Sequence, residues 1–461
     1  MSETLIASIS GIRGIFGAGL DPEALVRYAS AYAEWQVNRL RGQRRPLVVV
    51  GRDGRVTGDL CASIVRGSLQ ACGCDVVDAG LATTPTVEMA VLIEKADGGI
   101  ILSASHNPAE WNALKLLNER GEFLTPGQGQ EVLDLAASPV AGRAVSFDQT
   151  GSSRTRDFLD QHIDAILALD FIDPAAIASA DFRIVVDGIN SVGGVAIPML
   201  LKRLGVQEKS VTCVNCEPTG LFAHVAEPLP ENLIDTIRIV GETEADLGIV
   251  VDPDADRLAL IENGGTYFSE ELTQVLAADF MWSFREGPFV TNLSSSRAIE
   301  DLAERYGQKV YRSAVGEINV VQEMQRVGAI LGGEGNGGVI LPDLHYGRDA
   351  LVGVAITLQY LASRRMQLSD ARAILPTYYM AKLKAPLGGA SPDEALARLA
   401  EKYRSEEIST IDGLKIDFET GWVHMRKSNT EPIVRIYAEE RTREGVNALA
   451  ERFRGELLNA G

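Results

Sequence analysis

Short apolar runs typical of strands alternate with helical segments along much of this chain of 461 residues. Buried strands are expected at 46–51, 75–80 and 98–105, and segments of helical periodicity at 60–72 and 84–96 separate them. Strands that alternate with helices must be joined by crossover connections. This pattern therefore predicts a mainly parallel sheet that helices bury on both faces.

The same unit recurs further along the chain. A strand, a turn and a helix are expected within 182–205, a strand at 246–252, and another series of strands and helices within 288–333. The pattern changes after about residue 370, where strands, a hairpin and two helices are expected. The sequence therefore predicts repeated α/β units followed by a smaller α+β domain.

The net charge of −19 argues against a non-specific nucleic-acid binder, which would need a basic face. The first residues lack the pattern of a signal peptide, and no apolar run reaches the ~20 residues that span a bilayer. Five cysteines in so long a chain are typical of a reducing compartment, so we expect a cytoplasmic location. Cys213 and Cys216 lack a second pair at zinc spacing, which favours a structural or incidental role.

Polar side chains in the segment 103–108 follow the apolar run that begins at residue 98. Ser105 lies at the carboxyl end of this predicted strand, where open α/β sheets place their ligands. A serine hydroxyl is a weak nucleophile without help from its neighbours. An ordinary polar turn is the alternative interpretation.

Three aspartates, Asp252, Asp254 and Asp256, alternate directly after the strand expected at 246–252. This alternation directs their side chains to one side, where three like charges are unfavourable unless a cation lies among them. Mg²⁺ prefers oxygen ligands and suits a site that handles phosphate. We therefore predict a metal site rather than a solvated acidic loop, with Arg257 placed to pair with an anion on the metal.

Two further stretches are candidates for ligand binding. The segment 332–338 carries Glu334 and Asn336 between glycines, which suits hydrogen bonds to sugar hydroxyls. A dinucleotide-binding loop is disfavoured because no helix is expected directly after it. The segment 426–435 gathers two arginines, hydroxyls and backbone amides in one turn, which favours phosphate binding. A plain glycine turn and a surface hairpin are the respective alternatives.

Two isolated basic residues complete the candidates. Arg13 lies between glycines within 11–17, which suits a close approach to a ligand. Lys115 follows Ser105 by ten residues, and a neighbouring cation is expected to lower its pKa enough for acid–base chemistry. Each would be an ordinary surface charge if it stood alone.

Taken together, these stretches resemble the α-D-phosphohexomutase family over essentially the whole chain. Four motifs occur in the order of that family: a phosphoserine loop at 103–108, a magnesium loop at 252–257, a sugar-binding loop at 333–338 and a phosphate-binding loop at 426–435. The stretches 51–55, 185–194 and 226–233 also resemble family sequences.

The resemblance implies an α/β fold with three related α/β/α domains, which have mixed, mainly parallel sheets, and a smaller C-terminal α+β domain. We expect a phosphoserine-loop domain at 1–152, a metal-loop domain at 153–256, a sugar-binding domain at 257–370 and a phosphate-binding domain at 371–461.

The resemblance also implies a reaction. Ser105 carries a phosphoryl group to a hexose phosphate, the resulting bisphosphorylated sugar turns over in the site, and its other phosphate returns to Ser105. Hexose 6-phosphate and 1-phosphate are thereby interconverted. Glucosamine phosphate is the favoured substrate, and mannose and glucose phosphates are the alternative. One Mg²⁺ per active site and a sugar 1,6-bisphosphate activator are implied.

The residue roles implied by the resemblance fall into three groups. Catalytic roles go to Ser105, His106, Lys115, Arg13 and Arg257; substrate binding goes to Glu334, Asn336, Arg426, Ser428, Asn429, Thr430 and Arg435; Mg²⁺ binding goes to Ser105, Asp252, Asp254 and Asp256. Gly338 departs from the family pattern, because many members carry a histidine there. That role is absent or is supplied elsewhere, and spacing does not assign it to His345.

Two rival functions use the same residues. A metal-dependent phosphatase would transfer phosphate from Ser105 to water, but a two-metal site would need more ligands than the sequence groups together. A non-catalytic sugar-phosphate binder is disfavoured because the serine, aspartate and arginine motifs are all intact. We expect a hexose phosphate or amino-sugar phosphate as the binding partner, no nucleic acid, no membrane, and a monomer or homodimer.

Overall fold

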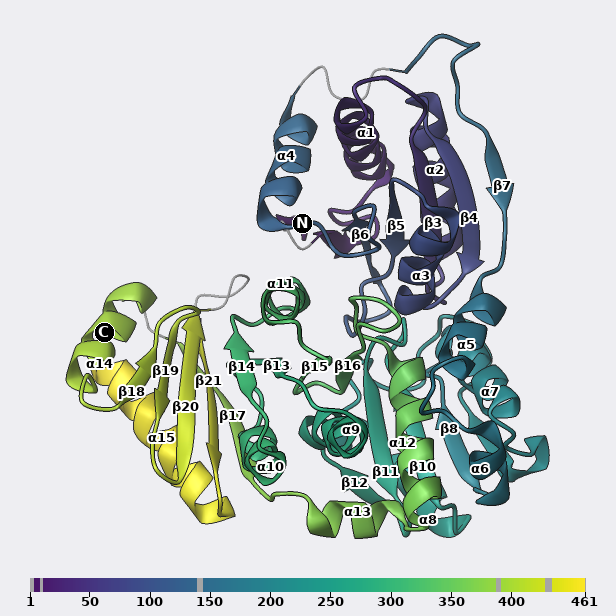
Figure 1. Cartoon of the computed structure of the whole chain (residues 1–461). Helices are drawn as coiled ribbons and strands as arrows, with labels where there is room; N and C mark the ends of the chain where they lie inside the picture. The colour runs from purple at the N-terminus through teal and green to yellow at the C-terminus, as the bar shows by residue number, and fades with distance from the viewer. Residues whose placement is uncertain (1–3, 9–10, 139–143, 387–390, 428–432, 461) are drawn as a thin grey trace. The chain divides into compact units, whose positions relative to one another are not determined.

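The chain forms two compact units in this computed structural model, which describes residues 4–8, 11–138, 144–386, 391–427 and 433–460 (Figure 1). The first unit contains residues 1–273 and 336–372, and the second contains residues 274–335 and 373–461.

The first unit begins with a seven-stranded mixed sheet in the order β1-β2-β6-β5-β3-β4-β7. Its central strands β3, β4 and β5 are parallel, as the sequence predicts, whereas β6 runs antiparallel to both β5 and β2. The strands are β1 (Ile6–Ser8), β2 (Gly11–Ile15), β3 (Leu47–Arg52), β4 (Asp75–Leu81), β5 (Gly98–Leu102), β6 (Trp111–Leu117) and β7 (Ser153–Thr155).

Helices bury both faces of this sheet. Alternate side chains of β3 enter different cores, since Val48 and Val50 pack with residues of α1, α2 and α4, while Val49 packs with Val87 of α3. The strand run is therefore apolar throughout, as expected for a sheet between two helical layers. The helices are α1 (Pro22–Arg39), α2 (Gly58–Ala71), α3 (Thr84–Glu94) and α4 (Pro126–Ala137).

A second sheet in the same unit has the order β12-β11-β10-β8-β9. Strands β9, β8 and β10 are parallel, and β11 turns back antiparallel to β10. The strands are β8 (Ile184–Asp187), β9 (Val211–Val214), β10 (Leu247–Val251), β11 (Leu258–Glu262) and β12 (Thr266–Phe268). The helices are α5 (Leu159–Leu167), α6 (Pro174–Ser179), α7 (Gly193–Arg203), α8 (Ile234–Glu242) and α12 (Ala350–Arg364), with short 3-10 turns at Glu208–Ser210 and Pro230–Asn232.

A third sheet has the order β14-β13-β15-β16, and β13 is parallel to both β14 and β15. Its strands are β13 (Phe289–Asn292), β14 (Val310–Ser313), β15 (Leu331–Glu334) and β16 (Gly338–Ile340). The accompanying helices are α9 (Glu270–Phe284), α10 (Ala298–Tyr306), α11 (Glu317–Val327) and α13 (Leu368–Ile374).

The C-terminal part of the second unit is an antiparallel sheet in the order β17-β21-β20-β19-β18, and its core packs against two helices. The elements are β17 (Tyr379–Pro386), α14 (Pro392–Lys402), β18 (Glu407–Ser409), β19 (Leu414–Asp417), β20 (Gly421–Lys427), β21 (Ile433–Glu440) and α15 (Arg443–Ala460).

The predicted fold class is confirmed: three α/β/α domains with mixed sheets precede a smaller α+β domain. Among the described residues, no helix combines the length and the apolar character needed to cross a membrane.

Candidate active site

Ser105 lies in a turn that follows β5, and both its backbone and its surroundings are unusual. Its φ of +47° falls in the left-handed region, which non-glycine residues rarely occupy outside functional turns. The residue is buried, and its amide donates a hydrogen bond of 2.9 Å to Ser103 Oγ. The turn therefore fixes the direction in which the Ser105 hydroxyl points.

Arg55, which sequence reasoning did not select, holds this turn in place. Its guanidinium pairs with Asp53 at 3.0 Å and is itself 1% exposed. The same group donates to four backbone carbonyls of the Ser105 turn and the residues after it, at Ser105 (2.6 Å), Asn107 (2.8 Å), Pro108 (2.5 Å) and Trp111 (2.9 Å). A planar group with five donors suits this task, and lysine does not.

We predict that Arg55→Lys lowers turnover about tenfold or more and that Arg55→Met also lowers the melting temperature. Both changes leave buried carbonyls without donors, which costs about 1–3 kcal/mol for each such group. Arg66→Met, on the neighbouring α2, is the control because Arg66 pairs with Asp78 instead of the turn. Wild-type turnover in Arg55→Lys would show that the turn does not depend on the guanidinium fork.

The three aspartates occupy the tight connection between β10 and β11. Each is completely buried, and their ligand atoms lie within 4.8 Å of one another. Ser105 Oγ donates to Asp252 Oδ2 at 2.7 Å, which brings together residues 147 positions apart. The Oδ1 atoms of Asp254 and Asp256 accept no hydrogen bond from the described residues although both are buried. Oxygens in this state fit a divalent cation, and carboxylates are the ligands that Mg²⁺ prefers.

Two side chains from the first sheet and its helices contact the same oxygen of this acidic group, Asp254 Oδ2. Lys115 Nζ lies 2.5 Å from Asp254 Oδ2 and 3.7 Å from Asp256 Oδ2. Thr84, the first residue of α3, donates its hydroxyl to Asp254 Oδ2 at 2.5 Å. Thr84 is a second contact that the sequence did not reveal, because a threonine at a helix start usually serves only as a cap.

The electrostatics of the group indicate a missing positive charge. Burial and the neighbouring carboxylates of Asp256 and Asp254 raise the pKa of Asp252 well above its usual range. Burial acts on Asp254 in the same direction, but Lys115 holds the pKa of Asp254 below its usual range. A cation among the three carboxylates would relieve this repulsion.

The carboxylates around Lys115 oppose the lowering of its pKa that a neighbouring cation is expected to produce. Burial lowers the pKa of Lys115, but the carboxylates of Asp254 and Asp256 outweigh burial and raise it. The sequence could not reveal this, because it does not show that two carboxylates lie within 4 Å of the ammonium group. Lys115 is therefore a protonated group in this arrangement.

Three arginines surround the residue next to Ser105. His106 Nδ1 lies 3.4 Å from Ser105 Oγ, and burial, followed by the positive charges of Arg257, Arg348 and Arg13, lowers the pKa of His106 to about 2. His106 is therefore a neutral imidazole at neutral pH. Arg257 Nε is buried and lies 3.9 Å from Asp256 Oδ1, with no hydrogen-bond partner in the part of the chain that the structure describes. Burial lowers the pKa of Arg13 on β2. This concentration of guanidinium groups suits a phosphate anion.

The predicted sugar-binding residues lie at the turn between β15 and β16. Glu334 is 3% exposed, and its Oε1 accepts hydrogen bonds from Asn292 Nδ2 at 2.8 Å and from the Gly316 amide at 3.3 Å, all in the second unit. Asn336, in the first unit, accepts from the Gly338 amide at 3.1 Å. Glu334 is thus a fixed carboxylate, and Asn336 shapes the turn itself.

The predicted phosphate-binding turn joins β20 and β21 in the second unit, and Ser428, Asn429 and Thr430 lie outside the described residues. Arg426 and Arg435 are direct cross-strand partners, and Lys384 on β17 pairs in register with Arg435. Three basic side chains therefore lie in one row on one face of this sheet. Arg426 pairs with Asp412 at 2.8 Å, whereas the buried Nε of Arg435 meets no acceptor among the described residues. Like charges directly opposite are unfavourable, so the row favours a bound anion.

We predict that Arg435→Ala raises KM for the 1-phosphate and for the 6-phosphate of the sugar to a similar extent, by about 10- to 100-fold. The reaction that the family resemblance implies needs a substrate that binds both ways round, so each of its phosphates would bind in turn at this same site. Initial rates in both directions measure this, with Arg443→Ala, at the start of α15, as the control. A change in one direction only would contradict a shared phosphate site.

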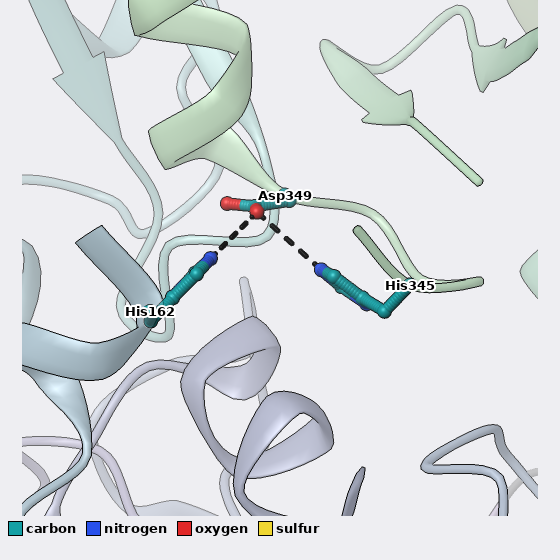
Figure 2. Close-up of side chains that lie close together, drawn as sticks. All are labelled: His162, His345 and Asp349. Atoms are coloured by element: carbon teal, nitrogen blue, oxygen red, sulfur yellow. Dashed lines mark hydrogen bonds and ion pairs between the residues drawn. The ribbon is translucent and has the colours of Figure 1, made fainter. Parts of the chain in front are cut away.

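A second buried group consists of His162, His345 and Asp349 (Figure 2). Asp349 Oδ2 lies 2.9 Å from His162 Nε2 and 3.4 Å from His345 Nε2, and His345 Nδ1 lies 3.1 Å from Glu88 Oε2. His162, His345 and Asp349 bring their donor atoms within 4.8 Å of one another, as a metal site would. However, both ring nitrogens of His345 face carboxylates, so the imidazolium ion itself supplies a positive charge there. Although burial acts against it, Asp349 and Glu88 raise the pKa of His345 to about 10.

This raised pKa predicts how stability depends on pH. A histidine whose pKa is raised on folding stabilises the folded chain fully below about pH 6.5, and that contribution is lost as the pH rises through about 10. We therefore expect the difference in free energy of unfolding between wild type and His345→Gln to be large at pH 6 and to shrink towards pH 10. Denaturant titrations at several pH values measure it. A difference that stayed constant over this range would contradict the imidazolium assignment.

Comparison with known proteins identifies the family. Models of the phosphoglucomutase/phosphomannomutase alpha/beta/alpha domains I, II and III match residues 6–140, 160–265 and 269–378, and the model of the C-terminal domain matches residues 382–456. A phosphoglucomutase/phosphomannomutase of Thermococcus kodakarensis is 36% identical over 459 residues, which cover 96% of this chain and 98% of the relative. This chain belongs to the α-D-phosphohexomutase family. The resemblance seen in its sequence is confirmed, and the chain is a phosphohexomutase.

Other relatives of this phosphohexomutase carry different substrate names. A phosphoglucosamine/phosphogalactosamine mutase of Sulfurisphaera tokodaii is 30% identical over 454 residues, which cover 96% of this chain and 97% of the relative. The crystal structure of a phosphoglucomutase/phosphomannomutase family protein from Burkholderia thailandensis superposes with a TM-score of 0.83 at 26% identity, covering 99% of this chain and 97% of that one. The family is metal-dependent, and the three buried aspartates can bind a metal ion.

Proposed function

We propose that this phosphohexomutase carries its phosphoryl group on Ser105 and holds one Mg²⁺ with Asp252, Asp254, Asp256 and an oxygen of Ser105 or its phosphate. The supporting observation is the 2.7 Å hydrogen bond from Ser105 Oγ to Asp252, beside two buried carboxylate oxygens that accept no hydrogen bond from any described residue. When bound, Mg²⁺ supplies positive charge to the carboxylates and to a phosphoryl oxygen.

The residues of the first unit have complementary tasks. A sugar hydroxyl oxygen bonds to phosphorus as the bond from phosphorus to Ser105 Oγ breaks, and the reverse exchange returns the other phosphate to Ser105. Lys115, which is protonated, is assigned a proton shuttle: its ammonium group gives a proton to the departing Ser105 Oγ, and the resulting amine takes up the proton that the sugar hydroxyl loses. Arg13 and Arg257 offset the charge that spreads over the phosphoryl oxygens, and neutral His106 lies against Ser105 Oγ.

The remaining candidate residues bind the sugar and the phosphate that is not reacting. Glu334 and Asn336 are assigned to hydroxyl groups of the sugar. Arg426 and Arg435, with the hydroxyls of Ser428 and Thr430 and the amide of Asn429, are assigned to the phosphate that is not reacting. The row of basic side chains on β17, β20 and β21 supports this assignment.

Glucosamine phosphate is the substrate that we propose first. The phosphoglucosamine/phosphogalactosamine relative supports it. Glucose and mannose phosphates are the second candidates, because the relative with 36% identity is a phosphoglucomutase/phosphomannomutase. A sugar 1,6-bisphosphate would act as the activator by phosphorylating Ser105. The five free cysteines support a reducing compartment such as the cytoplasm.

A coupled assay tests this proposal. Glucosamine, mannose and glucose 6-phosphates are compared as substrates, each with its 1,6-bisphosphate, and formation of the 1-phosphate is measured alongside release of inorganic phosphate. We expect the highest kcat/KM with glucosamine 6-phosphate and little phosphate release. A higher value with mannose or glucose phosphate would transfer the assignment to that sugar. Stoichiometric release of phosphate without a 1-phosphate product would instead indicate a phosphatase.

A further inference from the structure

Gly338 is small because the side chain of Arg348 occupies the space beside it. A Cβ atom at position 338 would lie 2.3 Å from Cδ and 2.8 Å from Cγ of Arg348. Contacts this short do not occur between real carbon atoms, so a larger residue at 338 would displace the stem of Arg348. The two positions therefore compete for one volume, and in this chain the arginine fills it.

The segment that carries Arg348 is bonded to the aspartate connection. Gly337 accepts a hydrogen bond from the Leu258 amide at 3.1 Å, and the Ala350 amide donates to the Ala255 carbonyl at 3.2 Å. Between these two contacts, Arg348 Nη2 donates to Asp256 Oδ2 at 2.7 Å, and Arg348 is only 8% exposed. A buried guanidinium thus reaches the acidic group from a segment that follows the aspartates in the sequence, whereas Lys115 precedes them.

The residue after Arg348 is fixed by the second buried group. Asp349 Oδ2 is the atom that contacts both His162 and His345 (Figure 2). Asp349 Oδ1 accepts a hydrogen bond from the Leu351 amide at 2.8 Å and so caps α12. Its own amide donates to the Val339 carbonyl on β16 at 2.8 Å. These contacts of Asp349 restrain the backbone from which the side chain of Arg348 projects.

We propose that Arg348 is a positioning residue of this phosphohexomutase, which takes the volume left by Gly338, fixes Asp256 and places a permanent positive charge beside the phosphoryl site. The inference rests on the proposed roles of Ser105 and the aspartates. It also answers the question raised by the absent histidine at 338, because the stem of Arg348 fills the space beside that position and its guanidinium bonds to Asp256.

The physical effect of Arg348 is twofold. The bond to Oδ2 holds one rotamer of Asp256. Its Oδ1, which accepts no hydrogen bond among the residues described, therefore keeps its direction. The guanidinium charge also reduces the repulsion between three carboxylates and an arriving phosphate dianion. Loss of such a supporting contact typically costs about 10- to 100-fold in activity.

Four variants test the assignment. Arg348→Met removes the charge with little change in volume, Arg348→Lys retains the charge without the fork, Gly338→Ala displaces the stem of Arg348, and the fourth combines Gly338→Ala with Arg348→Met. The controls are Arg203→Met, in a surface ion pair of the same unit, and Gly67→Ala, where an added Cβ meets nothing within 4 Å. Melting temperature, kcat, KM and the ³¹P chemical shift of phosphorylated Ser105 are measured for each.

We expect Arg348→Met and Gly338→Ala each to lower kcat about 10- to 100-fold with KM changed less than threefold, and the double variant to be no worse than Arg348→Met alone. Arg348→Lys should recover part of kcat, and the ³¹P shift should move in Arg348→Met but in neither control. If Arg348→Met does not fold, Gly338→Ala and Arg348→Lys still decide the matter. Additive losses, an unmoved ³¹P shift or wild-type kcat in Gly338→Ala would overturn the proposal. A wild type that is active only as a phosphatase would overturn the proposed function instead.

Discussion

Ser105→Ala should abolish mutase turnover, with a loss of at least about a thousandfold, while sugar-phosphate binding persists. The substitution removes only the hydroxyl group, which is the proposed carrier of the phosphoryl group. We therefore expect no neighbouring residue to replace it in the transfer. The Ser105 turn should survive because Arg55 binds its carbonyl groups and not the side chain. Steady-state rates and isothermal titration with sugar phosphate measure the two effects separately.

Ser63→Ala, on the exposed side of α2, is the matched control and should retain wild-type turnover. Incubation with sugar 1,6-bisphosphate followed by mass spectrometry should add one phosphate to the wild type and none to Ser105→Ala. If Ser105→Ala still interconverted the two sugar phosphates, a different phosphoryl carrier would have to exist.

Asp254→Asn should reduce turnover by about a hundredfold or more and should weaken Mg²⁺ binding. The amide removes one negative charge from the three carboxylates and offers a weaker ligand to a divalent cation. It also weakens the pairing with Lys115, whose ammonium group lies 2.5 Å from Asp254 Oδ2. The Mg²⁺ concentration at half-maximal rate should therefore rise, and excess chelator should abolish the activity of the wild type.

Binding of Mn²⁺, followed by electron paramagnetic resonance, gives a readout of the metal site that does not depend on turnover. Asp246→Asn is the control, since Asp246 precedes the same strand, β10, but pairs with Arg183 at the surface. Unaltered Mn²⁺ affinity in Asp254→Asn, or full wild-type activity in excess chelator, would contradict the metal site.

The fold could be predicted from the sequence to a large extent because apolar periodicity records burial. The run 46–51 matches β3, whose residues alternate between two cores, and the run 98–105 matches β5 until Leu102. The sequence does not show where β5 ends, because Ser103 and Ala104 remain buried after the strand hydrogen bonds stop. It also does not show that β6 runs antiparallel, since burial alone does not record strand direction.

The candidate site was predictable where a side chain has distinctive chemistry. A serine after a strand and three alternating aspartates point to ligands by their residue types, and the structure brings them together. Arg55 escaped detection because its partners are backbone carbonyls, which leave no trace in the sequence. Arg348 was not predicted as a site residue because its position depends on the space that is left where Gly338 has no side chain.

The hydrogen bonds from Arg55 to four backbone carbonyls have a consequence for the catalytic cycle. In the proposed reaction, Ser105 alternates between a free and a phosphorylated form in every turnover, which changes its charge by about two units. A turn shaped by that phosphate would have to rearrange twice in each cycle and would lose speed to those rearrangements. Here the guanidinium of Arg55 fixes the backbone of the turn before the phosphoryl group arrives. The entropic cost of ordering the turn therefore falls on folding and not on each turnover, and the backbone keeps one conformation while Ser105 gains and loses its phosphate.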